Sequence, residues 1–182
     1  MKNVFFALLI FCSQSFAQKI AIDATLGSHY NIQNGLLGSN LTASVALNSN
    51  KRDRIQLLAI INFYNESDKT KSYGNSLADG LGTHQYSFSK GLGIEYFFEK
   101  SRKISISGSI LHTNVVYNQK FVSGNTARET TSNDNFIGFL PNLHYYYLVP
   151  KSLVYFKVNA GSFISINTIS PSVQFGLGYS IK

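Results

Sequence analysis

Three charged residues stand inside runs of alternating apolar and small side chains: Asp23, Glu95 and Lys157. Each shares its face with the small residues and lies within a few residues of one end of its run. Since an unpaired charge is costly away from bulk water, we expect Lys157 to pair with Asp23, with Glu95 or with both. The trio forms either a gate or proton path, or a structural plug. We favour the plug because, if such segments form strands that close into a narrow barrel, side chains fill its interior.

The remaining residues that could do chemistry show no spacing typical of a catalytic or metal site. The chain has four histidines, His29, His84, His112 and His144, and one cysteine, Cys12. The sequence contains no metal-ligand spacing, no phosphate-binding glycine loop and no Cys–His pair. We therefore interpret the histidines as polar lining and expect no metal, no cofactor and no catalytic group.

The first 17 residues have the organisation of a secretory signal peptide. Lys2 supplies a positive start, residues 4–11 are apolar, and residues 15–17 provide small positions for cleavage after Ala17. The apolar run is shorter than the roughly 20 residues of a membrane-spanning helix. Bulky Phe11 before Cys12 disfavours a lipoprotein signal. We expect residues 1–17 to be removed, which leaves a mature chain from Gln18 without cysteine.

Alternation with a period of two recurs along the rest of the chain and predicts eight strands. The expected strands are residues 19–30, 40–48, 55–65, 85–98, 104–117, 136–149, 154–164 and 172–181. Three connections are short, at residues 49–54, 99–103 and 150–153. Residues 66–84 and 118–135 are long, polar connections, and 31–39 and 165–171 are intermediate. Short turns at one end and longer loops at the other are typical of membrane β-barrels, and an even strand count places both termini at the short-turn end.

Composition decides which face of these strands meets lipid. Charged residues make up 14% of the chain, compared with about 25% in a typical soluble domain. The face opposite the apolar one carries small, mostly uncharged residues, which fit a narrow lumen and not a water-facing surface. Aromatic residues cluster near strand ends, as in the girdles of membrane barrels. The net charge, +7 with Lys2 and +6 without it, is scattered through turns and loops, so we expect no nucleic-acid partner.

The closing segment, Val173 to Ile181, is similar to the last strand of the small Gram-negative outer-membrane proteins of the OmpA/OmpX-like group, although this chain ends on Lys182 and not on an aromatic residue. The resemblance covers residues 18–182. It implies an all-β fold, a closed eight-stranded antiparallel up-and-down transmembrane β-barrel, in the cell outer membrane with both mature termini in the periplasm.

Two residues complicate the expected wall of the barrel. Lys90 has the parity of the lipid-facing residues and lies near the outer leaflet, where its ammonium could extend to a lipopolysaccharide phosphate. A bulge at Lys90–Gly91 would instead turn it away, and both alternatives stay open. Pro141 interrupts the sixth strand, where we expect a bulge or a local break.

For function, we expect a non-enzymatic barrel with a structural, adhesive or accessory-subunit role. Its recognition surface would be the loops 66–84 and 118–135, and its partners would be outer-membrane lipids, lipopolysaccharide or a larger outer-membrane protein complex. The alternatives are a lipid A deacylase or acyltransferase, or a narrow pore. Deacylases of this fold carry a His-x-Ser pair, whereas His112 is followed two residues later by Asn114. The sequence therefore supplies no catalytic residue for that activity.

Overall fold

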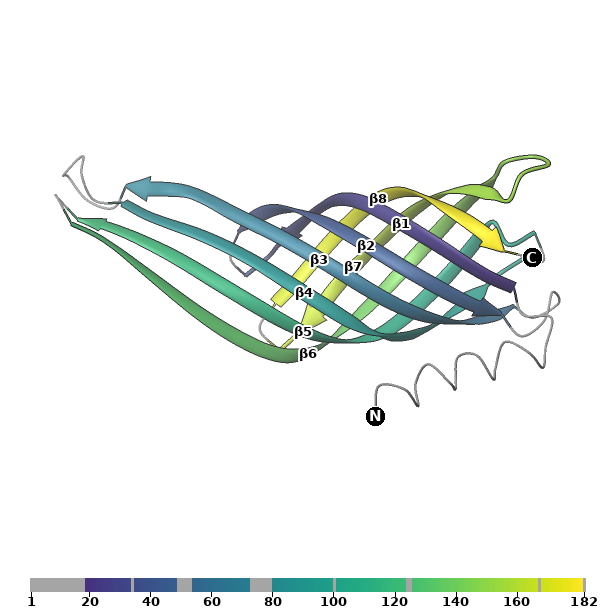
Figure 1. Ribbon diagram of the computed structural model, residues 1–182, viewed down its shortest axis with the longest axis horizontal. Helices are drawn as coiled ribbons and strands as arrows, with labels where there is room; N and C mark the ends of the chain where they lie inside the picture. The colour runs from purple at the N-terminus through teal and green to yellow at the C-terminus, as the bar shows by residue number, and fades with distance from the viewer. Residues whose placement is uncertain are drawn as a thin grey trace.

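The computed structural model describes residues 19–33, 35–48, 54–72, 80–99, 101–123, 126–166 and 168–181, and these residues form eight strands (Figure 1). The strands are β1 (Lys19–Asn31), β2 (Leu36–Asn48), β3 (Ile55–Ser72), β4 (Gly80–Phe97), β5 (Ile104–Ser123), β6 (Thr126–Leu148), β7 (Val154–Ser165) and β8 (Thr168–Ile181). Each pairs antiparallel with its sequence neighbours, and β8 closes onto β1. The predicted closed up-and-down barrel is confirmed. No helix among the described residues is long and apolar enough to span a membrane.

The strands are strongly staggered around the barrel. A path of Cα partners that starts at Ile22 crosses all eight strands and returns to β1 at Ile32, ten residues further along. The last step of this path is the hydrogen bond from Ile32 N to Ile169 O, at 3.0 Å. With a rise of about 3.3 Å per residue and about 4.8 Å between strands, the stagger corresponds to a tilt of about 40°. The barrel is therefore narrow, and its interior has room for side chains only.

The two faces of the wall have the expected polarity. Large apolar side chains point outward and are exposed, for example Leu26 (62%), Leu92 (70%) and Ile110 (65%). Exposed aromatic residues form two levels on the outer wall: Tyr96, Phe98, Tyr145, Tyr147 and Tyr179 near the turn end, and Phe63, Tyr86 and Phe88 near the middle of β3 and β4. Buried polar residues, among them Thr25, Asn62 and Ser105, point inward. This arrangement is inverted relative to a water-soluble protein and fits a wall surrounded by lipid.

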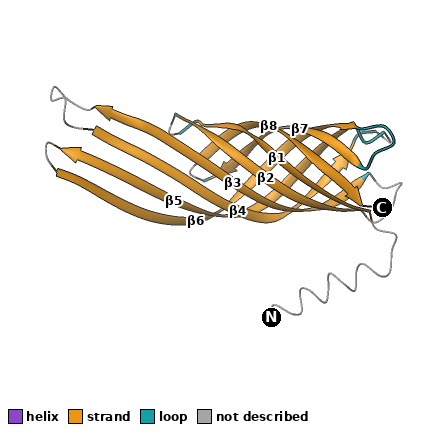
Figure 2. Ribbon diagram, turned by 45° about the horizontal axis from the view of Figure 1, so that its top comes forward, coloured by secondary structure: helices purple, strands orange, loops and turns teal. Residues whose placement is uncertain are grey.

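The two ends of the barrel differ in length. At the turn end, where β1 begins and β8 ends, the connections between strands are short. At the hairpin end, β3, β4, β5 and β6 continue far beyond the other four strands (Figure 1, Figure 2). Pairing of β2 with β3 stops at Glu66, and pairing of β6 with β7 starts only at Phe139. We call the part of these strands in residues 67–72, 80–84, 118–123 and 126–131 the projecting sheet.

The prediction that residues 66–84 and 118–135 are loops is therefore wrong. Most of both segments is paired strand, and only residues 73–79 and 124–125 fall outside the strands and outside the described residues. The alternation disappears there because both faces are polar, as the exposed run from Arg128 to Asn135 shows. The ladder of backbone hydrogen bonds nevertheless continues, since antiparallel pairing needs no apolar face.

Pro141 produces a break and no bulge. The β6–β7 ladder has no pair at Leu140 or Pro141, yet its register is the same on both sides of the gap, from Phe139↔Ile164 to Asn142↔Gly161. Proline has no N–H to donate, so the break falls where that donor is missing. The expected signal peptide of residues 1–17, with its cleavage site before Gln18, lies outside the described residues.

Candidate functional site

The lumen near the turn end holds the first two predicted charges. Lys157 Nζ on β7 lies 3.0 Å from Asp23 Oδ2 on β1, and both side chains are 3% exposed. Asp23 also accepts hydrogen bonds from Ser44 Oγ at 2.9 Å and from Tyr155 Oη at 3.2 Å. Both oxygens of the Asp23 carboxylate therefore accept hydrogen bonds. A buried charge is tolerated inside a barrel only when its polar atoms are satisfied in this way.

Glu95, the third predicted charge, is held by a different set of groups. Its carboxylate accepts hydrogen bonds from Gln56 Nε2 and Tyr146 Oη, each at 2.5 Å, and from Ser105 Oγ. Tyr146 links the two centres, because its ring lies 5.4 Å from Lys157 Nζ. The structure therefore brings Asp23 and Lys157 into direct contact and joins Glu95 to them through an aromatic ring.

A third group in the lumen was not expected from the sequence. Ser107 Oγ lies 2.7 Å from His144 Nε2, and His144 Nδ1 lies 2.7 Å from Asn159 Oδ1. The order of contacts is that of a nucleophilic triad, in which the second ring nitrogen orients the base. A reacting serine also needs space for its substrate, and Ser107 is only 4% exposed. Asn159 continues instead to Thr25 and Gln174, so the three residues belong to a lumen-wide chain of hydrogen bonds.

The lumen is also less polar than predicted. Buried Leu58, Ile60, Leu111, Leu140 and Phe163 pack with Ala46 and Tyr64 into one apolar cluster inside the wall. Only small and polar residues were expected there. On β3, Leu57 and Ile61 face outward while Leu58 and Ile60 face inward, so both faces of this strand are apolar and the alternation does not show which residues are buried.

A second buried side-chain pair lies toward the hairpin end. His29 Nε2 is 2.7 Å from Glu66 Oε1, and Asn31 Nδ2 donates to Glu66 Oε2 at 3.1 Å. The His29 ring also packs edge-on against Tyr64, with 4.7 Å between ring centroids. This pair could not be expected while Glu66 was assigned to a loop. His29, expected as ordinary polar lining, in fact closes the top of the lumen.

Lys90 keeps the outward orientation expected from its parity. It pairs in unbroken register with Ile61 on β3 and with His112 on β5, so the alternative of a bulge at Lys90–Gly91 is wrong. Lys90 and His112 are both exposed, and they lie side by side on the outer wall. Just beyond them, toward the hairpin end, Phe88 pairs with Asn114. The side chains of Lys90 and His112 therefore lie close to the aromatic level formed by Phe63, Tyr86 and Phe88.

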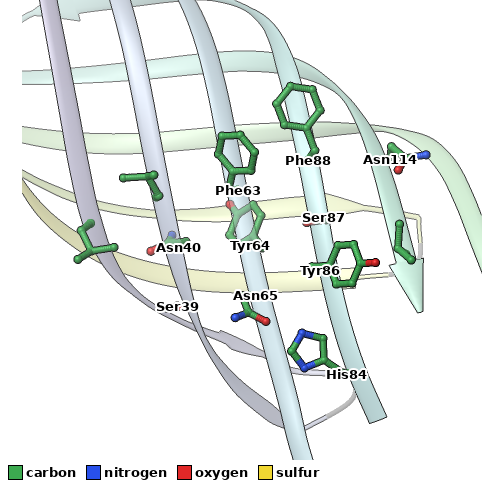
Figure 3. A pocket seen from close by; sticks show the side chains of 13 residues that line it. Ser39, Asn40, Phe63, Tyr64, Asn65, His84, Tyr86, Ser87, Phe88 and Asn114 are labelled. Carbon is green, nitrogen blue, oxygen red and sulfur yellow. The ribbon is translucent and has the colours of Figure 1, made fainter. Parts of the chain in front are cut away.

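A groove of about 510 Å³ opens on the same outer wall (Figure 3). Apolar side chains, Leu41, Phe63 and Phe88 among them, line one part of it beside Asn114, and Asn65, His84 and Tyr86 line the part toward the hairpin end. The change from apolar to polar lining marks the boundary at which lipid chains give way to head groups. The groove could therefore hold part of a lipid at the membrane surface.

The projecting sheet is held by its backbone and by exposed polar pairs. Thr131 Oγ1 donates to Asn118 Oδ1 at 2.9 Å, and Asn114 Nδ2 donates to Asn135 Oδ1 at 3.0 Å. At its base, burial and the nearby charges of Asp134 and Glu66 raise the pKa of Tyr117, so its phenol stays neutral. Residues 126–138 of β6 pair with β5 alone, which leaves one edge of the sheet open.

Comparison with known proteins identifies the architecture. No protein-family model matches the chain, and no curated protein matches it in sequence. Among solved structures, the attachment invasion locus protein Ail of Yersinia pestis, crystallised with the heparin analogue sucrose octasulfate, is similar with a TM-score of 0.59 and 10% identity over 90% of this chain and 99% of Ail. A major outer membrane protein from Thermus thermophilus is similar with a TM-score of 0.55 and 10% identity, over 91% and 100% of the two chains. The chain therefore has the fold of a small outer-membrane β-barrel.

Proposed function

We propose that this protein is a non-enzymatic outer-membrane barrel that presents the projecting sheet to partners outside the cell, in an adhesive or accessory-subunit role. The observation that carries the proposal is the extension of β3–β6 beyond the lipid-facing wall. A membrane barrel needs only about 9–11 residues per strand to cross the bilayer, and β6 has 23. The extra length serves no purpose in spanning the membrane.

The open edge of β6 supplies the recognition chemistry. Along residues 132–138, where β6 pairs with β5 alone, the outer edge of β6 can accept an extended segment of another protein as an additional strand. Charged residues along this edge, Arg128, Glu129 and Asp134, are exposed and oppose indiscriminate pairing. A partner therefore needs both an extended segment and matching charges.

Charge disfavours a simple polyanion as the ligand of the segments 66–84 and 118–135. Ail was crystallised with a heparin analogue. In this chain, the segments 66–84 and 118–135 outside the lumen carry four basic residues, Lys69, Lys71, Lys120 and Arg128, and four acidic ones, Asp68, Asp79, Glu129 and Asp134. A balanced surface of this kind fits a protein partner better than a sulfated polysaccharide.

The orientation follows from the same asymmetry. The turn end, with both mature termini, faces the periplasm, and the hairpin end faces outward, because long extensions in such barrels are extracellular. Lys90 and His112 then lie at the outer leaflet, where they meet lipopolysaccharide phosphate beside the groove of Figure 3.

The two alternative functions have weaker support. A lipid-modifying enzyme would need a reachable nucleophile, whereas Ser107 is buried beside His144. A narrow pore would need a water-filled lumen, whereas the apolar cluster around Leu111 and Phe163 occupies it. Both features favour a closed structural scaffold.

Removing the projecting sheet tests the proposal. A variant that joins Asp68 to Thr83 and Asn118 to Thr131 by Asn-Gly turns shortens both hairpins at existing Cα partners. We expect it to reach the outer membrane in normal amounts and to lose attachment of expressing cells to immobilised host or bacterial surface proteins. Equal attachment by the full and shortened proteins, across a panel on which the full protein attaches, would contradict the proposal. Protease added to intact cells should cut the full protein only at the hairpin end.

A further inference from the structure

The positive charge of the mature chain is concentrated at one end. In the sequence, nine basic residues flank or connect the strands at their turn-end limits: Lys19, Lys51, Arg52, Arg54, Lys100, Arg102, Lys103, Lys151 and Lys182, of which Lys51, Arg52, Lys100 and Lys182 fall outside the described residues. Only two acidic residues, Asp53 and Glu99, accompany them. Because the segments 66–84 and 118–135 have as many acidic as basic residues when buried Glu66 is left out, the excess charge of the sequence comes from the turn end.

Three of these cations can be placed at the rim of the wall. Arg54 Nη1 lies 3.4 Å from Tyr96 Oη and 3.3 Å from the carbonyl oxygen of Phe98. Tyr96 and Phe98 are exposed on the outer, lipid-facing side, so the Arg54 guanidinium lies against the lower aromatic girdle. Lys103 and Lys151 are exposed in the neighbouring turns. We call Arg54, Lys103 and Lys151 the basic rim.

The turns that carry the rim are closed by hydrogen bonds. Phe98 N donates to Ile104 O at 3.1 Å, and Ser152 N donates to Val149 O at 3.1 Å. Lys151 has a φ of 59°, a left-handed conformation that glycine or asparagine adopts at lower cost. A basic side chain occupies this position nonetheless. Lys103 and Lys151 are thus held in short turns that backbone hydrogen bonds close.

Arg102 differs from the rim residues. Its guanidinium carbon lies 4.4 Å from the centroid of the Phe97 ring, which is buried on the inner side of the wall. It borders a cavity of about 430 Å³ at the mouth of the lumen, beside Tyr146 and Tyr155. Arg102 therefore belongs to the closure of the lumen, and it is not part of the basic rim.

We propose that the basic rim binds the phosphate head groups of anionic phospholipids, of the phosphatidylglycerol type, in the leaflet that surrounds the turn end. The rim lies directly beyond an aromatic girdle, which is the level of lipid head groups. Guanidinium and ammonium groups donate charge-assisted hydrogen bonds to phosphate oxygens, and cations beside a membrane surface attract anionic lipid. The leaflet in which the rim binds these lipids is the periplasmic one only if the orientation proposed above is correct. The lipid preference itself does not depend on it.

Tyrosine fluorescence provides the test, since the chain has no tryptophan and Tyr96 lies beside Arg54. The purified full-length barrel is titrated with brominated phosphatidylglycerol or phosphatidylcholine, and quenching gives the relative association constant. The test variant carries Arg54→Gln, Lys103→Gln and Lys151→Gln. The matched control carries Lys71→Gln, Lys120→Gln and Arg128→Gln, which removes the same charge from the hairpin end. Retained heat-modifiable mobility in SDS shows that each variant is folded.

We expect the native protein to prefer phosphatidylglycerol at low ionic strength, with the preference falling about fivefold for each rim cation removed and weakening with salt. The control should keep the native preference. No preference in the native protein, or equal loss in both variants, would overturn the proposal.

Two further experiments test other anionic ligands of the basic rim. In the first, brominated lipid A replaces the brominated phospholipid in the titration. In the second, the protein is sedimented with purified peptidoglycan. Loss of lipid A binding or of cosedimentation in the rim variant, with phosphatidylglycerol binding unchanged, would overturn the phospholipid assignment. Protease accessibility on intact cells decides the orientation separately, so failure of the lipid preference and failure of the proposed function are distinguishable.

Discussion

Lys157 on β7 reaches across β8 to Asp23 on β1, with 3.0 Å between Nζ and Oδ2. The strand between them makes this possible, because the partner of Lys157 on β8 is Gly176 and the partner of Asp23 is Gly178. With no side chain at Gly178, the Tyr155 ring lies over β8 and its hydroxyl donates to the same carboxylate oxygen that Lys157 contacts. The ion pair and the two glycines form one structural unit.

Lys157→Met should destabilise the barrel by about 3–5 kcal/mol, because it leaves Asp23 buried without its counter-charge. Urea unfolding in detergent micelles, followed by circular dichroism, measures the loss. Adding Asp23→Asn should restore much of it without any change at Glu95, which has its own hydrogen-bond donors. Exposed Lys103→Met is the control. If the double variant is as unstable as the single one, the ion pair does not explain the loss.

Gly178→Ala should cost about 1–3 kcal/mol, since the new Cβ would lie 2.1 Å from Tyr155 Cζ and push the ring from Asp23. Gly108→Ala is the matched control, because its Cβ would meet only the edge of Phe139, at 3.1 Å, on the outward face. The same urea titration compares the two variants. Equal stability would show that β8 tolerates a side chain under Tyr155.

Leu92→Arg should lower stability by about 2–4 kcal/mol, because Leu92 is 70% exposed on the lipid-facing wall, well between the two aromatic girdles. Thr131→Arg, in the projecting sheet outside the membrane, should change stability little. Refolding yield into lipid vesicles and urea unfolding report both. A similar loss in the two variants would mean that lipid does not surround Leu92.

Ser107→Ala should leave the masses of lipid A and the phospholipid composition of expressing cells unchanged, because Ser107 is buried and acts in the hydrogen-bond chain of His144 and Asn159. We expect instead a loss of about 1 kcal/mol of stability as His144 loses one partner. Mass spectrometry of lipids from cells with the native protein, the variant and no barrel makes the comparison. A lipid species that requires Ser107 would establish an enzyme and contradict the proposed function.

The sequence by itself determined the strand number, the faces and the turn end. Period-two alternation is a local signal, and it is strong wherever one face meets lipid and the other meets a polar lumen. The parity that placed Asp23, Glu95, Lys157 and Lys90 needed nothing beyond it, and each of these side chains points as parity predicted. At the turn end the expected strand limits agree closely with those of the structure, because short turns break the pattern sharply.

Only the tertiary structure decided which residues meet across the lumen and how far the strands extend. Lys157 contacts Asp23 and not Glu95 because the ten-residue stagger and two glycines bring β7 and β1 together, and neither is visible in a single strand. Ser107, His144 and Asn159 meet for the same reason. The sequence of the projecting sheet does not predict strands, because its side chains are polar on both faces and show no alternation of apolar and polar residues. Its strands are held by hydrogen bonds between backbones. The contact between Glu66 and His29 was not predictable for the same reason. It depends on how far the pairing of β3 with its neighbours extends and not on local composition.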